Sequence, residues 1–412
     1  MFDLNELQVP AYLVGGWVRD RLLNRNSKYL DLDFVLPEQA VETAKVIAKR
    51  HQAGFVLLDA ERQIARVVFK DGTADFAQQM GDSIEADLSR RDFAMNAIAI
   101  DCTKIDCPII SEVNYVPAVI DPFLGKQDIR YRSIRMIRAD NLQDDPLRIL
   151  RAYRQAAQLG FEIEPVTRKY LIEFSPLLKN IAAERIRTEL SYLLSQGTEG
   201  TRWLVLAAED GILSQWLAPK NLMMARFIQV DRAIAQVINQ LHDLQNYFAQ
   251  VLSSDRSVTV IIKLAALSAS ATALTNLGFS RLEQRWIATL LRHLPQFITY
   301  LNQGLEQGLV TPKEQYQLFA NTMEMFPALT VLAIASGQSI NSIIPWLDRW
   351  LDPNDPIAHL VPILNGDDLK TELGLSAGQK IGDILSELKW AQVEQVFTDR
   401  NSAIAYARTL IN

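Results

Sequence analysis

Residues 13–36 read LVGGWVRDRLLNRNSKYLDLDFVL, and this stretch decides the fold of the N-terminal part of the chain. An apolar run leads directly into Gly15-Gly16, and the residues from 17 to 23 have the spacing of a short helix. Paired glycines after a strand let the backbone approach a phosphate, and the N–H groups at a helix start attract the anion. Arg19, one turn into the helix, adds a cation for the same phosphates. The glycine pair alone also fits an ordinary tight turn.

Two carboxylates follow in the same stretch. Asp31 and Asp33 are two residues apart in an apolar, strand-like context, so both side chains lie on one face of the strand. Two neighbouring carboxylates repel each other unless a cation neutralises them, and Mg²⁺ prefers such oxygen ligands. A pair of such ions is the recurring device of phosphoryl and nucleotidyl transfer. The alternative is a solvated acidic strand end.

Outward from this stretch, the chain divides into an α/β front and a helical rear. Strands are expected at residues 11–14, 34–36, 55–58, 65–69 and 98–100, with a helix at 37–50. After about residue 140 the spacing is helical. Helices are expected at residues 147–159, 183–195, 202–217, 225–252, 262–273, 281–301, 312–325 and 381–396.

The composition excludes several classes of protein. Of 412 residues, 42 are Lys or Arg and 48 are Asp or Glu, so the net charge of −6 argues against indiscriminate binding to nucleic acid. Cys102 and Cys107 are the only cysteines, which excludes a disulfide scaffold and fits a reducing compartment. No apolar run is long enough for a membrane span, and residues 1–10 do not read as a signal peptide. The segment 126–154 is nevertheless rich in arginine.

Two further motifs carry nucleotide chemistry. Residues 90–96 read RRDFAMN; the arginines suit a triphosphate, and Asp92 and Asn96 suit ribose hydroxyls. The alternative is a charged helix start capped by Asp92. Residues 144–148 read DDPLR at a helix start, which places Asp145 and Arg148 on one helical face. A carboxylate accepts from the cytosine amino group and a guanidinium donates to O2 and N3, although a simple salt bridge is also possible.

These motifs together resemble the class II tRNA nucleotidyltransferase and bacterial poly(A) polymerase family, within the polymerase β superfamily. The resemblance continues through residues 121–125 and 184–189 and covers about half of the chain. It implies an α+β protein: a small mixed-sheet nucleotidyltransferase head (residues 1–138), then an all-helical neck with the nucleotide-selecting motif (139–200), a body (201–350) and a tRNA-binding tail (351–412).

The resemblance also implies the site residues. Asp31 and Asp33 are the expected catalytic residues and hold two Mg²⁺ ions, with Asp75 either assisting them or lying on the surface. Asp145 and Arg148 act as a protein template for the incoming base, and residues 184–189 brace the helix behind it. The expected nucleotide-binding residues are Gly15, Gly16, Arg19, Arg90, Arg91, Asp92, Asn96, Asp145, Arg148 and Arg151.

The segment 77–88 bears on the product. Family members that add the terminal A carry a flexible loop here, and this segment resembles the shorter one of the CC-adding subgroup. We therefore expect CMP addition from CTP to the tRNA 3′ end, with full CCA addition from CTP and ATP as the alternative. Poly(A) polymerase is less favoured because the chain lacks a basic C-terminal extension. Other rivals are a nucleotidyltransferase with a different acceptor and a non-catalytic RNA-binding relative.

The remaining expectations concern partners and location. We expect tRNA and CTP, with ATP in the alternative, as the binding partners, no membrane and no obligate protein partner. A cytoplasmic location is expected. The only His-Asp dipeptide, His242-Asp243, predicts a surface helix and no metal-dependent hydrolase, and Cys102 and Cys107 alone do not predict zinc.

Overall fold

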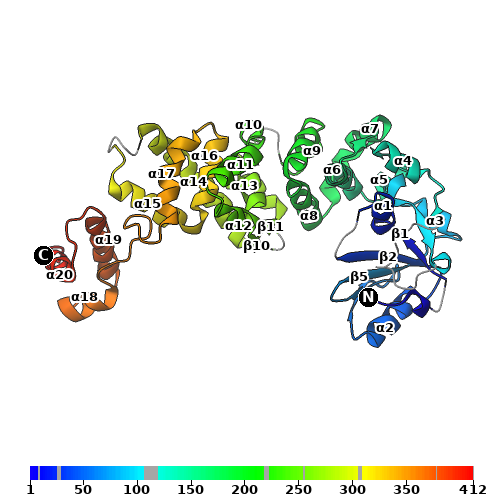
Figure 1. Cartoon of the computed structure of the whole chain (residues 1–412), viewed down its shortest axis with the longest axis horizontal. Coiled ribbons are helices and arrows are strands. Elements are labelled where there is room, and N and C mark those ends of the chain that lie inside the picture. The colour runs from blue at the N-terminus through cyan, green and yellow to red at the C-terminus, as the bar shows by residue number, and fades with distance from the viewer. Residues whose placement is uncertain are drawn as a thin grey trace. The chain divides into compact units, whose positions relative to one another are not determined.

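The computed structural model describes residues 1–7, 10–25, 29–105, 119–217, 222–253, 256–304, 309–376 and 378–411. These residues form two compact units, Met1–Gln215 and Trp216–Asn412. The first unit contains a mixed sheet followed by helices, and the second is almost entirely helical (Figure 1). The expected α+β class is therefore confirmed. Cys107 lies outside the described residues.

The sheet of the first unit has seven strands in the order β3-β4-β5-β2-β1-β6-β7. Its central strand, β2, is parallel to β5 and antiparallel to β1. The strands are β1 (Tyr12–Val14), β2 (Leu30–Leu36), β3 (Gly54–Asp59), β4 (Ile64–Val68), β5 (Gly72–Gln78), β6 (Ala99–Asp101) and β7 (Val119–Ile120). The strand predicted at residues 34–36 begins earlier, at Leu30, because the two aspartates that interrupt the apolar run belong to it.

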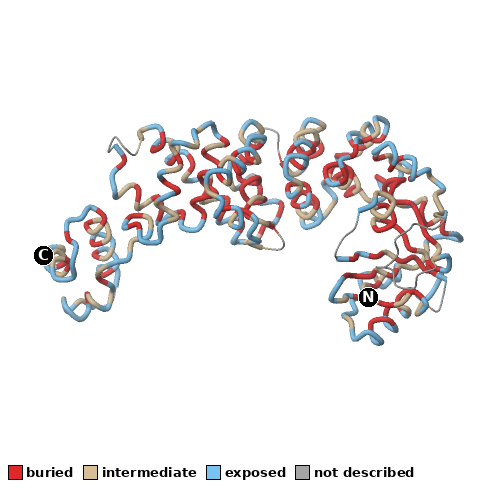
Figure 2. The backbone as a smooth tube through the Cα atoms, in the orientation of Figure 1, coloured by how far each residue is buried: buried red, intermediate tan, exposed pale blue. Residues whose placement is uncertain are grey.

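The two faces of β2 differ in character. Leu32 and Phe34 are buried, and Phe34 stacks on Phe76 of β5 with ring centroids 5.2 Å apart. Helix α2 (Ala40–Arg50) lies against β4 and β5 and buries its predicted apolar side (Figure 2). Since side chains alternate along a strand, Asp31 and Asp33 lie on the opposite face. The carboxylates thus lie on the face opposite Leu32 and Phe34, and the same face continues at Val35 into a second hydrophobic cluster with Ile84 and Leu88.

The other helices of the first unit surround the carboxylate face and continue away from it. Helix α1 follows β1 directly, as predicted. The helices are α1 (Gly16–Leu22), α3 (Ile84–Leu88), α4 (Gly125–Tyr131), α5 (Ala139–Asp144), α6 (Leu147–Leu159), α7 (Pro165–Phe174), α8 (Ala183–Leu194) and α9 (Gly197–Glu209). A short parallel strand pair joins the residues that follow α4 to the residues that follow α6. Its strands are β8 (Ser133–Ile134) and β9 (Glu162–Ile163).

The second unit packs its helices around buried aromatic and aliphatic side chains. Its longer elements are α11 (Val230–Gln240), α13 (Val258–Leu267), α14 (Arg281–Gln303), α15 (Pro312–Thr322), α16 (Phe326–Ala335), α17 (Ile340–Leu351), α18 (Gly366–Leu373), α19 (Gln379–Val393) and α20 (Arg400–Thr409). The single helix predicted at 225–252 is wrong: the segment forms α10 (Met224–Phe227), α11 and α12 (Leu244–Ala249), and ends in strand β10 (Val251–Ser253). Strand β10 pairs with β11 (Arg256–Ser257).

One segment of the second unit, Pro312–Ala335, is apolar and long enough to cross a membrane. It is divided among α15, a 3-10 turn and α16, and 72% of its apolar window is buried inside the protein. This segment is therefore a core helix pair. The last three helices share a hydrophobic cluster of their own, and Lys313 of α15 lies 3.8 Å above the Trp390 ring of α19.

Candidate functional site

The turn between β1 and α1 places the backbone next to a carboxylate. Gly15 has φ +75°, and a Cβ at this position would lie 2.8 Å from Oδ2 of Asp33. Both the positive φ and the close approach require glycine. Helix α1 begins at Gly16, and the first N–H groups of a helix have no partner within it. This turn has the geometry of a backbone cradle for an anion.

Strands β2 and β5 align three carboxylates. In the parallel register Asp33 lies beside Asp75, and Asp31 lies beside Thr73, whose hydroxyl donates to Asp31 at 2.6 Å. Asp75 accepts two hydrogen bonds from the Arg66 guanidinium at 2.7 and 2.8 Å. Asp75 is therefore neutralised by a fixed cation, whereas Asp31 and Asp33 have no such ion pair among the described residues.

Electrostatics distinguish Asp33 within this group. Its pKa is raised to about 6, chiefly by burial and also by the neighbouring Asp75 and Asp31, while Arg91 acts in the opposite direction. The site thus has an excess of negative charge that Arg91 does not balance. Hard oxygen donors with uncompensated charge fit a divalent cation. Within the described ranges, no cluster of three or more His, Cys, Asp or Glu side chains could hold a metal ion by itself.

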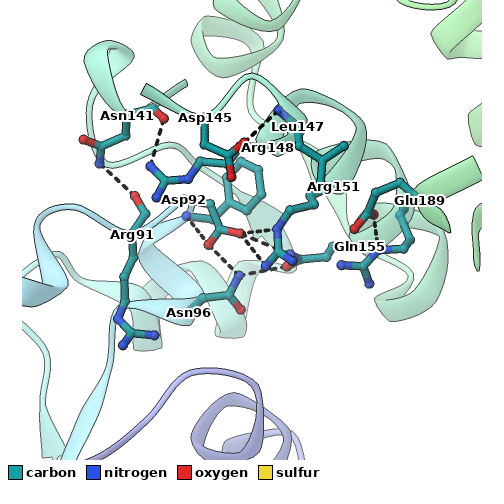
Figure 3. A network of polar contacts seen from close by, with 12 residues as sticks. Arg91, Asp92, Asn96, Asn141, Asp145, Leu147, Arg148, Arg151, Gln155 and Glu189 are labelled. Carbon is teal, nitrogen blue, oxygen red and sulfur yellow. Dashed lines mark hydrogen bonds and ion pairs between the residues drawn. The ribbon is translucent and has the colours of Figure 1, made fainter. Parts of the chain in front are cut away.

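The segment 90–96 is not a helix start: a turn follows α3 at residues 90–92, Phe93 forms a β-bridge with Met136, and a 3-10 turn follows at Ala94–Asn96. Asp92 is buried and accepts hydrogen bonds from Arg151 at 3.0 and 2.9 Å and from Asn96 at 2.9 Å (Figure 3). Burial would raise its pKa, but Arg151, Asn96 and the Phe93 N–H group more than compensate and hold it well below the ordinary range. Asp92 is thus a buried carboxylate anion at neutral pH.

Asn96 links this segment to the glycine turn. Its amide nitrogen donates to Asp92 and to Gln155, and its oxygen accepts from Arg19 Nη1 at 2.8 Å. Arg19 also contacts Asp20. Helix α1, the segment 90–96 and helix α6 are therefore connected through side chains, and Gln155 is a member of the network that the sequence did not suggest.

A polar cavity of about 630 Å³ brings most of the predicted residues together. It lies where α1, β2, the segment 90–96 and α6 meet. The predicted residues that line it are Gly15, Gly16, Arg19, Asp31, Asp33, Arg91, Asp92, Asn96 and Arg151. Tyr29, Arg154 and Gln155 also line it and were not predicted. The lining combines carboxylates, guanidinium groups and amides, which suits a nucleotide bound with a cation.

The other predicted residues line a second cavity of about 720 Å³. Arg90, Asp145 and Arg148 line it, together with Arg185 of α8, and Arg91 lines both cavities. Arg90 and Arg91 thus share the second cavity, and only Arg91 also reaches the first. The two cavities are neighbours within the first unit, and Arg91 marks their boundary.

Asp145 and Arg148 are not on one helical face, which corrects the prediction. Asp145 is extended (φ −137°, ψ 91°) and precedes α6, because the residue before a proline is disfavoured in helical conformation. Its carboxylate accepts from the Leu147 N–H at 3.3 Å and from Arg185 at 3.1 Å. The i,i+3 salt bridge is not among the ion pairs of the described residues.

Arg148 donates from Nη1 to the main-chain oxygen of Asn141 at 2.8 Å, and burial lowers its pKa. Asn141 is fully buried on α5, and its amide donates to the carbonyl oxygen of Ser89 at 2.8 Å. The same amide donates to the carbonyl oxygen of Arg91 at 2.7 Å (Figure 3). No local pattern marks Asn141 in the sequence, since its partners lie about fifty residues away. Its high burial and full hydrogen bonding appear only in the fold.

The segment between β5 and Arg90 is short and anchored. After Gln78, the Gln79 N–H donates to Leu36 O at 2.7 Å and the Met80 N–H to Asp87 at 3.0 Å. Helix α3 then occupies Ile84–Leu88, and Ser83 caps it. Residues 77–88 therefore form a compact connection.

Comparisons with known proteins agree with this geometry. The families described as "Poly A polymerase head domain", "Probable RNA and SrmB- binding site of polymerase A" and "tRNA nucleotidyltransferase domain 2 putative" match residues 11–135, 160–220 and 250–407. The chain is 40% identical to a CC-adding tRNA nucleotidyltransferase of Synechocystis sp., over 99% of this chain and 95% of the relative. It is 29% identical to the CC-adding tRNA nucleotidyltransferase of Geobacter sulfurreducens, over 93% and 87%.

A solved structure shares the fold. A CCA-adding enzyme in complex with ATP superposes with a TM-score of 0.73 at 21% identity, over 99% of this chain and 93% of that one. The likeness to this structure extends over both units of the chain.

Proposed function

Because the chain belongs to the tRNA nucleotidyltransferase and poly(A) polymerase family, we propose that it transfers CMP from CTP to the 3′ end of tRNA and stops after two residues. Nucleotidyl transfer to tRNA follows from the relatives over nearly the full chain. The restriction to CC rests on the short, hydrogen-bonded connection at residues 77–88 and on the two CC-adding relatives.

The proposed roles at the first cavity follow the chemistry of its lining. Asp31 and Asp33 hold the divalent cations, two Mg²⁺ ions, and the turn at Gly15-Gly16 receives the phosphates. Bound Mg²⁺ neutralises charge on the triphosphate and makes the attacking hydroxyl more acidic. Asp92 and Asn96, which Arg151 and Arg19 fix in place, are the residues that we assign to the ribose hydroxyls, because both line this cavity.

The reaction needs no covalent enzyme intermediate. The 3′-hydroxyl oxygen of the tRNA attacks the α-phosphorus of CTP and forms the new phosphodiester bond, while the bond to the β-phosphate oxygen breaks. Pyrophosphate leaves and the hydroxyl proton goes to solvent. The contribution of the chain is to align the two substrates and to exclude other nucleotides.

The proposed base selection uses the second cavity. Cytosine has an amino donor at N4 and acceptors at N3 and O2. The Asp145 carboxylate would accept from the amino group, and the Arg148 guanidinium would donate to the acceptors. Arg91, which lines both cavities, lies where the base and triphosphate parts of one nucleotide would join.

One gel tests the proposal. The substrate is a tRNA that lacks its CCA end, and the reactions contain CTP alone, ATP alone, or both. We expect two C additions with CTP, and no third step when ATP is also present. A third addition would show a full CCA-adding enzyme that uses CTP and ATP. Extension of an unstructured RNA by ATP alone would indicate a poly(A) polymerase.

The proposed cellular setting is the cytoplasm, where tRNA and CTP are available. We propose that the chain acts without a membrane and without an obligate protein partner.

A further inference from the structure

The buried side chain of Asn141 connects the two parts of the site that the proposed function needs at a fixed separation. Its amide nitrogen donates to two main-chain oxygens of the segment that ends in Asp92, namely those of Ser89 and Arg91. Its own main-chain oxygen accepts from Arg148 at 2.8 Å. One residue therefore holds the segment with the ribose-binding carboxylate on one side and the base-reading guanidinium on the other (Figure 3).

A second connection joins helix α6 to the same segment through Arg151. Arg148 and Arg151 are one turn apart on α6, and Arg151 binds Asp92 through two hydrogen bonds. Asn141 and Arg151 thus fasten the same helix to the same segment at two points. Together with the Gln155 contacts to Asp92 and Asn96, these two fastenings fix α6 against residues 89–96, and the Asn141 contact is the one nearest to Arg148.

The contacts of Asn141 are costly to replace. It is fully buried, and loss of its amide would leave two buried carbonyl groups without their donor. Arg138 donates to its side-chain oxygen at 3.3 Å, which fixes the orientation of the amide. The Asp145 N–H also donates to the Asn141 carbonyl, at 3.4 Å. The same main-chain atom therefore orients both residues that would read the base.

We propose that Asn141 is a positioning residue that sets the nucleotide selectivity of this chain. It holds Arg148 at a fixed distance from Asp92, so that only a base with hydrogen-bond acceptors at that distance pairs with the guanidinium. Cytosine N3 accepts a hydrogen bond, whereas uracil N3–H does not, so a fixed Arg148 rejects uracil. A mobile Arg148 tolerates both. This inference rests on the proposed function and assigns a specificity role to a residue that touches neither substrate.

Direct nucleotide binding tests the inference without the transfer reaction. The full chain is titrated calorimetrically with CTP, UTP and ATP in the presence of Mg²⁺ and without tRNA. For the wild type we expect tightest binding of CTP. Asn141→Leu keeps the branched shape of the side chain but removes both N–H donors, and we expect the ratio of CTP to UTP affinity to fall at least fivefold. Asn141→Ser, which keeps one donor, should give an intermediate ratio and covers the case in which the leucine variant does not fold.

The matched control is Tyr153→Phe. Tyr153 is a fully buried residue of the same helix, and its hydroxyl donates to Asp210 at 2.6 Å, away from both cavities. It should lower the melting temperature and leave the CTP to UTP ratio unchanged. The inference is overturned if folded Asn141 variants keep the wild-type ratio, or if Tyr153→Phe changes it equally. A wild type that binds none of the three nucleotides would instead contradict the proposed function, and the inference with it.

Discussion

At the scale of single residues, the carboxylates of β2 give the most direct prediction. Asp31→Ala and Asp33→Ala should each abolish CMP incorporation, because either change removes a ligand from a site with only two such carboxylates free of ion pairs in the described structure. Radiolabelled CMP incorporation measures the effect, and circular dichroism checks that the fold is intact. Asp59→Ala, at the end of edge strand β3, is the matched control and should retain activity. Incorporation above a few per cent of wild type in either site variant would contradict the metal-site assignment.

The glycine turn gives a second prediction at this scale. Gly15→Ala combines an unfavourable φ of +75° with a Cβ placed 2.8 Å from Asp33, so it should reduce incorporation more than tenfold by moving the carboxylate. Gly160→Ala has nearly the same backbone strain, φ +69°, with no atom within 4 Å of the added Cβ. It should cost only about 1 kcal/mol of stability. Urea unfolding and initial rates compare the pair, and equal activity in both variants would refute the role given to the close approach.

The residue scale also shows what the sequence could and could not predict. The turn at Gly15-Gly16 and the shared face of Asp31 and Asp33 follow from local rules, since strand period and glycine conformations act over a few residues. The geometry of Asp145 could have been predicted correctly from Pro146, which disfavours helix at the preceding residue. Asn141 and Gln155 could not, because their partners are brought near only by long-range packing.

At the scale of elements, the strand–turn–helix–strand order of the front was predicted well and the helices of the rear less well. The predicted strands and helix α2 all have counterparts, with bounds shifted by one to four residues. The segment 225–252 was predicted as one helix because its apolar periodicity continues across the breaks near residues 228 and 242. No proline or glycine marks those breaks, so tertiary packing decides them. The neighbouring short strands β10 and β11 escaped prediction for the same reason.

A buried ion pair in the second unit gives a prediction at the element scale. Arg256 of β11 pairs with the fully buried Glu283 of α14, which also closes the capping box with Ser280. Burial would raise the pKa of Glu283, but Arg256 and the Ser280 N–H hold it below its ordinary value of 4.5. A carboxyl whose pKa is lowered by folding contributes stability above its unfolded pKa, and this stability is lost as the pH falls through the folded pKa.

Glu283→Gln should therefore destabilise the protein by about 3 kcal/mol at pH 7, because it leaves a buried guanidinium without a counter-charge. The difference from wild type should shrink below about pH 4.5. Urea unfolding at several pH values measures both effects. Glu324→Gln, which removes an exposed partner 3.9 Å from Arg285, should cost under about 1 kcal/mol. Similar losses in the two variants would argue against a special role for burial.

At the scale of the whole molecule, the division into two compact units predicts the thermal behaviour. Chains with several cores often unfold in more than one step, and ligands stabilise only the unit that binds them. Saturating CTP with Mg²⁺, at about 100 times the dissociation constant, should add about 2.7 kcal/mol to the unit that contains the two cavities. In differential scanning calorimetry we expect one transition to move upward with CTP. Glu283→Gln should lower the melting temperature of the other transition. A single transition that responds to both changes would show that the two units unfold together.

The fold also changes the interpretation of the charges of the chain. The net charge of −6 excludes indiscriminate attraction to nucleic acid, and several arginines of the segment 126–154 are already engaged. Arg135 pairs with Asp128, Arg151 with Asp92 and Arg154 with Glu189. These arginines shape the site by fixing carboxylates. The sequence count alone would have assigned them to RNA phosphates.

The contact between the bare Cα of Gly15 and the Asp33 carboxylate has an evolutionary consequence. Neither position can drift alone: a side chain at 15 would displace the carboxylate, and a longer acid at 33 would collide with the turn. The two sites should therefore be inherited as a pair in every lineage that keeps the transferase reaction. Descendants that lose the reaction should be free to change both. A residue other than glycine at position 15 would then indicate, from the sequence alone, a descendant that no longer carries out the transferase reaction.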